Sequence, residues 1–231
     1  MTKNIGIGFY AGLPLTDPDA LQYVDLPMPT AGPMDLVVAV QAVSVNPIDT
    51  KLRVNISESG EPTIQGYDAT GTIVATGHQV TGFHVGDRVL YAGTTTRPGA
   101  NQRYHVVDAR IAAKAPAGPD DAALAALPLV GLTAWELLFE RMGFLPDAGA
   151  NAEQSLLIIN GAGGVGSMMA QLAHWAGLKV IATASPRHFD WLQQRHVDVA
   201  VDYHDNLIES VKRAGFATVD GVAILHQTEP Y

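Results

Sequence analysis

The chain has 231 residues, of which 47% are hydrophobic and 16% are charged, a composition typical of a globular protein with one large core or two smaller ones. Its 14 basic and 23 acidic side chains give a formal charge of −9, which argues against binding to nucleic acid or to an anionic membrane surface. Cysteine is absent, and this excludes a disulfide framework and any zinc site with thiolate ligands.

The sequence shows no signal for secretion or for membrane insertion. No basic segment precedes an apolar run at the amino terminus. The uncharged, Ala- and Leu-rich stretch at residues 122–135 is shorter than a membrane-spanning helix and contains Pro128. We therefore expect a cytoplasmic protein without a membrane partner.

Up to about residue 115, short strand-like runs alternate with Gly and Pro, which predicts an all-β, barrel-like unit. The runs are residues 5–10, 36–45, 71–77, 88–92 and 104–107. From Pro119 onward, helices rich in Ala and Leu give way to alternating strands and helices, a pattern typical of a parallel α/β sheet. We place the boundary near residue 125, between domains of residues 1–125 and 126–231.

The second half has a regular order of strands and helices. Strands are predicted over residues 156–160, 179–183, 199–201 and 221–225, and helices over residues 165–176, 189–194 and 207–214. The first of these helices has apolar residues at helical spacing and ends before Gly177.

A glycine-rich turn joins the first strand and first helix of this half. Residues 156–166 read LLIINGAGGVG and contain G-x-G-x-x-G at Gly161, Gly163 and Gly166. Between a strand and a helix this spacing indicates a dinucleotide-binding turn, because glycine allows a tight turn, close approach of the pyrophosphate and close helix packing. The helix N-terminus, including Gly164 and Val165, then offers unpaired N–H groups to the anion. The alternative is a turn that binds nothing.

The preferred cofactor depends on the end of the second strand. NAD-binding proteins place Asp or Glu there for the ribose 2′-hydroxyl, whereas this chain has Ser185 and Arg187 and no carboxylate before Asp190. A hydroxyl and a guanidinium suit a 2′-phosphate, so NADPH is favoured over NADH. Alternatively, Arg187 and His188 only interact with solvent beside the next helix.

Four blocks of sequence together resemble the quinone oxidoreductase branch of the medium-chain dehydrogenase/reductase superfamily. They are residues 44–49 (SVNPID) with Arg53, residues 66–71 (GYDATG), residues 86–89 (GDRV) and residues 127–134 (LPLVGLTA). The resemblance implies an α/β protein with an N-terminal GroES-like β-barrel catalytic domain, then a Rossmann domain, with the active site in the cleft between them.

Relatives with a catalytic zinc have Cys at the position of Asn46, His at that of Tyr67 and a second Cys within residues 128–130, so the resemblance implies no metal site here. Zinc polarises an alcohol or carbonyl oxygen. Without it, reduction of a quinone or an α,β-unsaturated carbonyl needs less help than alcohol oxidation, because the negative charge spreads into a conjugated oxygen that neutral donors stabilise.

The resemblance places Asn46 and Tyr67 in the cleft as catalytic candidates, and an amide N–H and a phenol O–H can both donate. The alternatives are an ordinary turn residue before Pro47 and a packed aromatic. The resemblance also implies that Thr133 lies near the nicotinamide and Tyr203 beside the adenosine phosphate; their alternatives are a buried helix hydroxyl and an aromatic at a strand end.

The remaining polar residues are given structural roles. Asp49 and Arg53 are expected to form only a local helix ion pair, and Asp68 is interpreted as a structural carboxylate rather than a general base. The histidines lack metal-binding spacing and are assigned to the surface or to packing.

The expected function is thus NADPH-dependent reduction of a quinone or enone, a small-molecule substrate. The alternatives are a cofactor-binding protein without turnover and, much less favoured, a zinc alcohol dehydrogenase; a homo-oligomer is compatible with either enzyme. The chain stops at residues 229–231, after the fourth strand of what should be a six-stranded sheet. We therefore expect an incomplete Rossmann domain, in a part of a longer protein or in a poorly active one.

Overall fold

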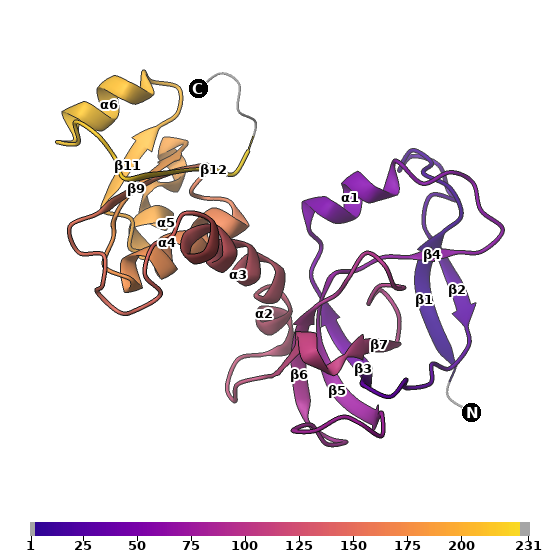
Figure 1. The fold of residues 1–231 in the computed structure, drawn as a ribbon. Helices are drawn as coiled ribbons and strands as arrows, with labels where there is room; N and C mark the ends of the chain where they lie inside the picture. The colour runs from indigo at the N-terminus through magenta and orange to yellow at the C-terminus, as the bar shows by residue number, and fades with distance from the viewer. Residues whose placement is uncertain (1–2, 227–231) are drawn as a thin grey trace. The chain divides into compact units, whose positions relative to one another are not determined.

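The computed structural model describes residues 3–226, and it divides the chain into two compact units, Met1–Leu129 and Val130–Tyr231 (Figure 1). The division lies close to the boundary that the change of sequence texture indicates near residue 125. The chain end at residues 229–231 lies outside the described residues.

The first unit consists of two antiparallel sheets and short helical segments. The larger sheet has the strand order β7-β3-β5-β6-β8, with β3 Asp35–Val43, β5 Asp68–Thr76, β6 Arg88–Ala92, β7 Tyr104–Asp108 and β8 Ala112–Lys114. The smaller sheet has the order β2-β1-β4, with β1 Asn4–Phe9, β2 Gln22–Leu26 and β4 Thr63–Ile64. The helix α1 spans Pro47–Arg53, and a 3-10 turn η1 spans Ala109–Ile111.

Alternating side chains of the larger sheet form the core of this unit. Leu36 and Val38 of β3 are completely buried and pack with Ile73, Val89 and Tyr91 from the neighbouring strands, as the two-residue period of a strand requires. All five strand-like runs of this half form strands. The short strands β2, β4 and β8 were not predicted, and α1, which has seven residues, was expected only as a local helix carrying Asp49 and Arg53.

The second unit contains a parallel sheet of four strands in the order β11-β10-β9-β12. Its strands are β9 Ser155–Ile159, β10 Lys179–Ala184, β11 Val199–Asp202 and β12 Gly221–Ile224. Its helices are α4 Gly164–Trp175, α5 Phe189–Gln194 and α6 Leu207–Arg213, with a 3-10 turn η3 at Pro186–His188. The spatial order, third, second, first, fourth along the chain, is that of the nucleotide-binding half of a doubly wound sheet.

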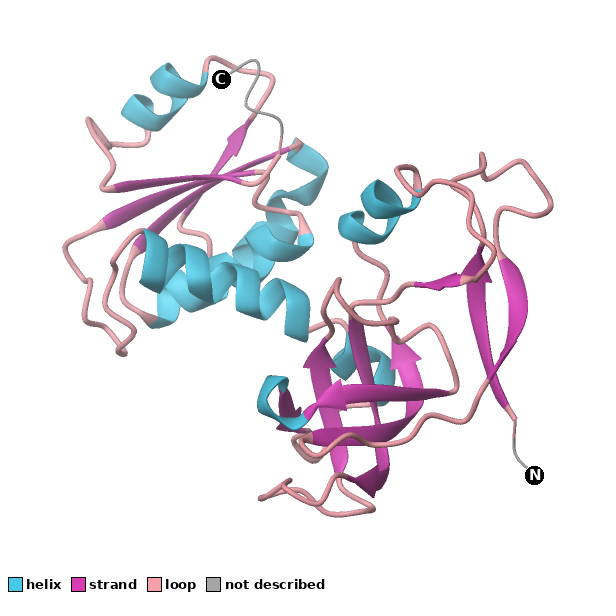
Figure 2. Cartoon of the chain, turned by 45° about the vertical axis from the view of Figure 1, so that its right-hand side comes forward, coloured by secondary structure: helices cyan, strands magenta, loops and turns pink. Residues whose placement is uncertain are grey.

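Helices cover both faces of this sheet (Figure 2). On one face, Met169 of α4 and Leu192 of α5 pack with Leu156 and Ile158 of β9. On the other face, Val211 of α6 packs with the alternate β9 residue Ile159. The predicted fold class, a GroES-like domain followed by a partial Rossmann domain, is therefore confirmed.

The helical segments α2 Asp121–Ala125, α3 Pro128–Trp135 and the π-helical turn η2 Glu136–Arg141 follow one another. Together they form a run of 21 residues, Asp121–Arg141, that is long and apolar enough to cross a membrane and is 28% buried. The sequence-based estimate stopped at the first charged residue and was too short. Length and composition alone are weak evidence, because a core helix of a water-soluble protein meets the same criteria.

Candidate cofactor and substrate sites

The glycine-rich turn leaves β9 through a left-handed residue, Asn160, whose φ is +66°. Asn adopts this conformation more readily than most residues. Its N–H donates to the Thr183 hydroxyl at 3.0 Å, and the Gly161 N–H donates to the Thr183 carbonyl at 2.9 Å. The tight turn was expected to need glycine, but no glycine of this turn has a positive φ. Asn160 makes the turn, and the glycines are required for other reasons.

Two of the glycines are required by packing within the protein. A Cβ added to Gly161 would lie 2.5 Å from the Ala182 Cβ of β10. A Cβ added to Gly166 would lie 2.5 Å from the Asn160 carbonyl oxygen and 2.7 Å from the Gly161 Cα. These distances are too short for any side chain, so the two positions bring the helix and the neighbouring strand close to the turn.

A Cβ on either of the other two glycines would have longer contacts, including one at 3.3 Å from the Gly163 position to the Asn160 carbonyl oxygen. A Cβ on Gly163 would have the Asn160 Nδ2 as its nearest neighbour, at 3.0 Å, and a Cβ on Gly164 would meet only the Val130 Cγ1, at 3.2 Å. Protein packing is therefore a weaker constraint here than at Gly161 and Gly166. The backbone at Gly163 and Gly164 is the part of the turn that a ligand can approach.

The amino end of α4 presents unpaired donors. Gly163 is the N-cap of this 12-residue helix, and the first hydrogen bond of the helix runs from the Ser167 N–H to the Gly163 carbonyl at 2.8 Å. Within residues 3–226, the N–H groups of Gly164, Val165 and Gly166 have no acceptor. Three free donors at the positive end of a helix dipole suit an anion such as a pyrophosphate.

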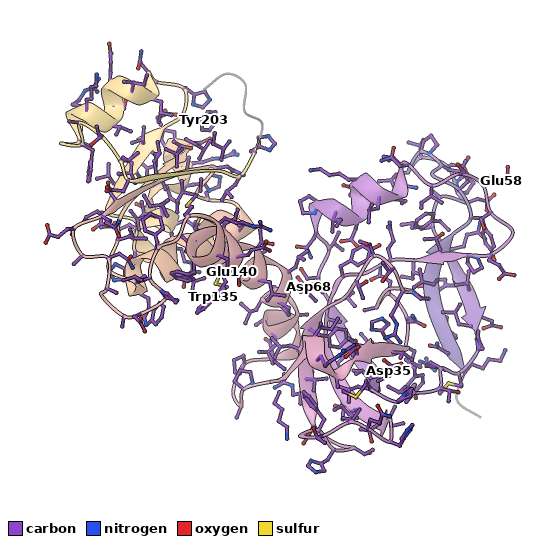
Figure 3. All side chains as sticks on the ribbon, viewed as in Figure 1. Asp35, Glu58, Asp68, Trp135, Glu140 and Tyr203 are labelled. Carbon is purple, nitrogen blue, oxygen red and sulfur yellow. The ribbon has the colours of Figure 1, made fainter. Side chains whose placement is uncertain are left out.

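Two predicted residues meet at the carboxyl ends of neighbouring parallel strands. Ser185 follows β10 and Tyr203 follows β11, and the Ser185 Oγ donates to the Tyr203 hydroxyl oxygen at 3.2 Å. Tyr203 is 43% exposed and is labelled in Figure 3. Arg187 lies on η3 with its side chain exposed, and its Nε donates to the His188 Nε2 at 3.1 Å. Both terminal nitrogens of the guanidinium remain available to a ligand.

Thr133 lies on α3 and is half-buried. It is one helical turn beyond Val130, the residue that contacts the turn at Gly164. Thr133 thus belongs to the same unit as the dinucleotide turn, as the family resemblance implies, and its place beside a nicotinamide stays a prediction.

In the first unit, Asn46 caps α1 and bonds to a buried carboxylate. The Asn46 N–H donates to the Asp49 Oδ2 at 2.7 Å. The side-chain Nδ2 donates to the Asp68 Oδ2 at 3.1 Å and to the Ser44 carbonyl at 3.4 Å. Both hydrogens of the amide are therefore used within this unit, and the donor role expected of Asn46 would require one of these bonds to break.

Asp68 has a structural position at the start of β5 (Figure 3). Its Oδ1 accepts the Leu129 N–H at 3.0 Å, and its side chain is completely buried. The pKa of Asp68 is raised to about 6, because burial raises it more than the bonds from Leu129 and Asn46 lower it, and the charge of Asp49 adds a smaller rise. The carboxylate thus joins three segments of the unit but is poorly solvated in its charged form.

The expected ion pair between Asp49 and Arg53 is wrong. Asp49 accepts the Asn46 N–H instead, and the Arg53 Nη1 donates to the Leu13 carbonyl at 2.7 Å. A carboxylate in the first turn of a helix accepts a hydrogen bond from an unpaired backbone N–H. This bond turns the Asp49 carboxylate away from Arg53, one turn later. The second oxygen of Asp49, Oδ1, is buried and has no partner among the described residues.

Tyr67 lines a cavity of 720 Å³ that lies entirely within the first unit. The side chain is 7% exposed, and the hydroxyl has no hydrogen-bond partner within the described part of the chain. Burial raises the pKa of this phenol, and the charge of Asp49 raises it further. The hydroxyl is therefore protonated at neutral pH and is free to donate to a ligand.

Comparisons with known proteins bear on both units. Residues 32–117 match the alcohol dehydrogenase GroES-like domain. A zinc-type alcohol dehydrogenase-like protein of Staphylococcus epidermidis is 37% identical to this chain over 226 residues, which cover 97% of the chain and 67% of the relative. The chain belongs to the medium-chain dehydrogenase/reductase superfamily.

Solved structures of this superfamily show the same fold. An alcohol dehydrogenase superfamily protein from Novosphingobium aromaticivorans has a TM-score of 0.82 at 29% identity and covers 96% of this chain. The quinone oxidoreductase of Escherichia coli, complexed with NADPH, has a TM-score of 0.73 at 28% identity and covers 91% of it. The present chain covers 66% and 62% of these two proteins, respectively, and so spans about two thirds of its relatives.

The residues of this chain do not fit the zinc that some names in the superfamily imply. The positions that the family resemblance associates with zinc hold Asn46 and Tyr67, and residues 128–130 are Pro, Leu and Val. Both oxygens of the neighbouring Asp68 already accept hydrogen bonds. Among residues 3–226, no three His, Cys, Asp or Glu side chains come together as a donor set.

Sequence reasoning missed some residues that the structure places at these sites. Asn160 could have been recognised, because an Asn between a buried strand and a Gly-rich turn is a candidate for a positive φ. The bond from Arg187 to His188 could have been anticipated from their adjacency. The cavity beside Tyr67 left no signal, because its walls come from segments scattered between residues 26 and 106.

Proposed function

We propose that this protein is an NADPH-dependent oxidoreductase that reduces quinones or α,β-unsaturated carbonyl compounds without zinc. Membership of an oxidoreductase superfamily supports an enzyme. The observation that carries the proposal is the amino end of α4, where three adjacent N–H groups are unpaired beside glycines with room for a ligand. A pyrophosphate has the charge and the acceptors that these donors require.

The choice of NADPH rests on the groups beyond β10. The Ser185 and Tyr203 hydroxyls lie 3.2 Å apart, and the terminal nitrogens of the exposed Arg187 side chain have no partner among residues 3–226. No carboxylate stands between Ala184 and Asp190 to hold a ribose 2′-hydroxyl. A 2′-phosphate would accept bonds from all three side chains, whereas NADH would leave Arg187 without an anionic partner. The NADPH complex of the Escherichia coli relative is consistent with this choice.

The substrate's oxygen is assigned to the first unit. When bound, the dihydronicotinamide supplies a hydride that adds to an electron-poor carbon and leaves negative charge on a conjugated oxygen. The Tyr67 hydroxyl would donate to that oxygen, since it is protonated and unpartnered. Asp68 and Asn46 hold the segment around Tyr67 rather than react, because their polar atoms bond to each other.

The proposal is tested by cofactor titration and by steady-state oxidation of NADPH, followed by its absorbance, with a panel of quinones and enones. We expect binding of NADPH and quinone-dependent turnover. Tyr67→Phe should lower kcat about a hundredfold, as loss of one oxyanion donor does, without changing the Kd for NADPH. Failure of the chain to bind NADPH would refute the proposal. Tight binding without turnover on any substrate would favour a non-catalytic NADPH-binding protein.

Three further expectations stay predictions. They are a cytoplasmic location, a homo-oligomeric state and the lack of a membrane partner. Light scattering of the purified chain, with and without lipid vesicles, measures the second and third directly.

A further inference from the structure

The cavity beside Tyr67 has walls formed by buried side chains and a rim formed by exposed ones. Its buried walls are formed by Ile64, Gln65, Tyr67 and His105, each at most 7% exposed. The rim is formed by exposed residues from several loops, among them Pro27, Thr30, Glu61, Thr95 and Pro98. A volume of 720 Å³ lies within the range of pockets that enclose whole small molecules.

Almost all of the buried polar groups in this wall are already paired. The Gln65 amide, turned so that both of its ends are satisfied, donates to the Asp49 carbonyl at 2.9 Å and accepts from the Arg53 N–H at 3.3 Å. The His105 Nδ1 lies 2.9 Å from the Tyr91 hydroxyl, and its Nε2 lies 3.0 Å from the Pro98 carbonyl.

These contacts define the state of His105. Only a ring nitrogen that carries a hydrogen can bond to the Pro98 carbonyl, so Nε2 is the donor and Nδ1 accepts from Tyr91. Burial lowers the pKa of His105 to about 4, and the ring is neutral. Of the buried polar side chains that line the cavity in the described chain, Tyr67 alone keeps an unpaired group.

The cavity also presents little net charge to a ligand. Arg97 forms two bonds to Asp35, at 2.9 and 3.0 Å, so its charge is compensated within the protein. Glu61 is exposed and lies at the rim. An anionic ligand would find no free cation on the wall and would be repelled by Glu61.

Apolar side chains also line the cavity. Leu52 and Ile56 come from α1 and the segment after it, and Leu26 comes from the end of β2. A simple quinone ring needs only a fraction of 720 Å³ and would leave this apolar surface in contact with water. A hydrocarbon chain attached to the ring would cover it, and each CH₂ group removed from water would tighten binding.

We infer that the cavity is the substrate site and that it selects uncharged quinones or enones that carry a long hydrocarbon chain. The carbonyl of the ligand accepts the Tyr67 hydroxyl, and the chain extends along Leu52 and Ile56 toward the rim. This inference rests on the proposed function and adds to it the class of substrate.

Binding to the full 231-residue chain tests the inference without NADPH, because the cavity lies within one unit. Calorimetry would compare a methylated benzoquinone with the same head group bearing a ten-carbon alkyl chain. We expect the alkyl form to bind at least about tenfold more tightly, since several CH₂ groups become buried. Equal affinities for the two compounds, or no binding of either, would overturn the inference.

Variants locate the site. Leu52→Trp or Ile56→Trp should weaken binding of the alkyl compound about tenfold and change binding of the short compound less than about twofold, because the new ring occupies the space of the chain. The control is Val54→Trp, on the same segment but 60% exposed and outside the cavity wall. Circular dichroism verifies folding, and one folded variant of the two is enough for the test. An unchanged affinity of that variant for the alkyl compound would contradict the inference.

A third variant separates this inference from the proposed function. Tyr67→Phe should weaken both compounds by a similar factor, about two- to tenfold, since one hydrogen bond is lost in each complex. If NADPH binds and short quinones are reduced but the alkyl chain has no effect on affinity, the proposed function stands and the substrate class is wrong. If NADPH does not bind but the alkyl quinone does, the cavity is a binding site and the oxidoreductase proposal is wrong.

Discussion

The dinucleotide turn of the second unit and the cavity of the first differ in the atoms that carry their chemistry. In the turn the donors are backbone N–H groups, and side chains matter mainly by their absence, as at Gly161 and Gly166. In the cavity the donor is one side chain, Tyr67, and its availability depends on how every neighbouring polar group is paired. The residues that form the backbone site are therefore close together in the sequence, whereas the residues that form the cavity are brought together by tertiary contacts.

Glycine substitutions within the turn test whether protein packing and ligand access are separate requirements. The largest effect is expected for Gly166→Val, because its Cβ would lie 2.5 Å from a backbone oxygen. We expect the second unit to lose at least about 3 kcal/mol of stability or not to fold. All three tryptophans, Trp135, Trp175 and Trp191, lie in this unit, so tryptophan fluorescence during urea unfolding measures the effect.

Gly163→Val should affect binding more than folding. The nearest obstacle to its Cβ is the Asn160 amide, a side chain that can move, whereas the new side chain would fill the space assigned to the pyrophosphate. We expect NADPH affinity to fall at least about a hundredfold, with the first unit unaffected in hydrogen exchange. A folded variant that binds NADPH normally would show that the turn is not the phosphate site.

Arg187→Ala tests the side-chain part of the cofactor site. Loss of charge-assisted bonds to the 2′-phosphate should weaken NADPH binding about ten- to a hundredfold and leave NADH binding nearly unchanged. Arg213→Ala is the control, since Arg213 is also exposed but lies in the last turn of α6. Equal Kd values for NADPH and NADH in the unmodified protein would contradict the assignment of Ser185, Arg187 and Tyr203.

Asp68→Asn tests the side-chain network of the first unit through its pH dependence. The folded pKa of about 6 lies above the ordinary value of 3.8. The contribution of Asp68 to stability is therefore fully present below pH 4 and is lost as pH rises through 6. The variant, which has no charge to bury, should gain stability relative to the unmodified protein by about 1 to 3 kcal/mol between pH 4 and pH 7.

Urea unfolding at several pH values, with hydrogen exchange of β5 to identify the first unit, measures this difference. The control is Asp87→Asn. Its partly exposed carboxylate is paired with Lys114 at 2.9 Å, and the bond to Lys114 lowers its pKa. The contribution of Asp87 is therefore present above pH 4, and its removal should give no gain as pH rises. A stability difference for Asp68→Asn that is flat with pH would show that the carboxylate is well solvated in the folded protein.

The sequence was most informative where a property belongs to neighbouring residues. The spacing of Gly161, Gly163 and Gly166 between an apolar strand and an amphipathic helix predicted the turn, and the lack of an acidic residue before Asp190 pointed to NADPH. It failed where other groups compete for a side chain: Asp49 and Arg53 are four residues apart, yet they bond to the Asn46 N–H and to the Leu13 carbonyl. A helical spacing shows which residues can meet, but competing backbone groups decide which do.

The sequence by itself determined the order of strands and helices in the second unit, the glycine-rich turn and the absence of thiolate ligands, because each follows from local residue type and short-range periodicity. Only the tertiary structure decided that Asn160 makes the turn, that the Asn46 amide is used by Asp68, and that Tyr67 keeps a free hydroxyl in a cavity. Hydrogen-bond donors are shared among residues far apart in the chain, and which donor stays free depends on all of its neighbours in space.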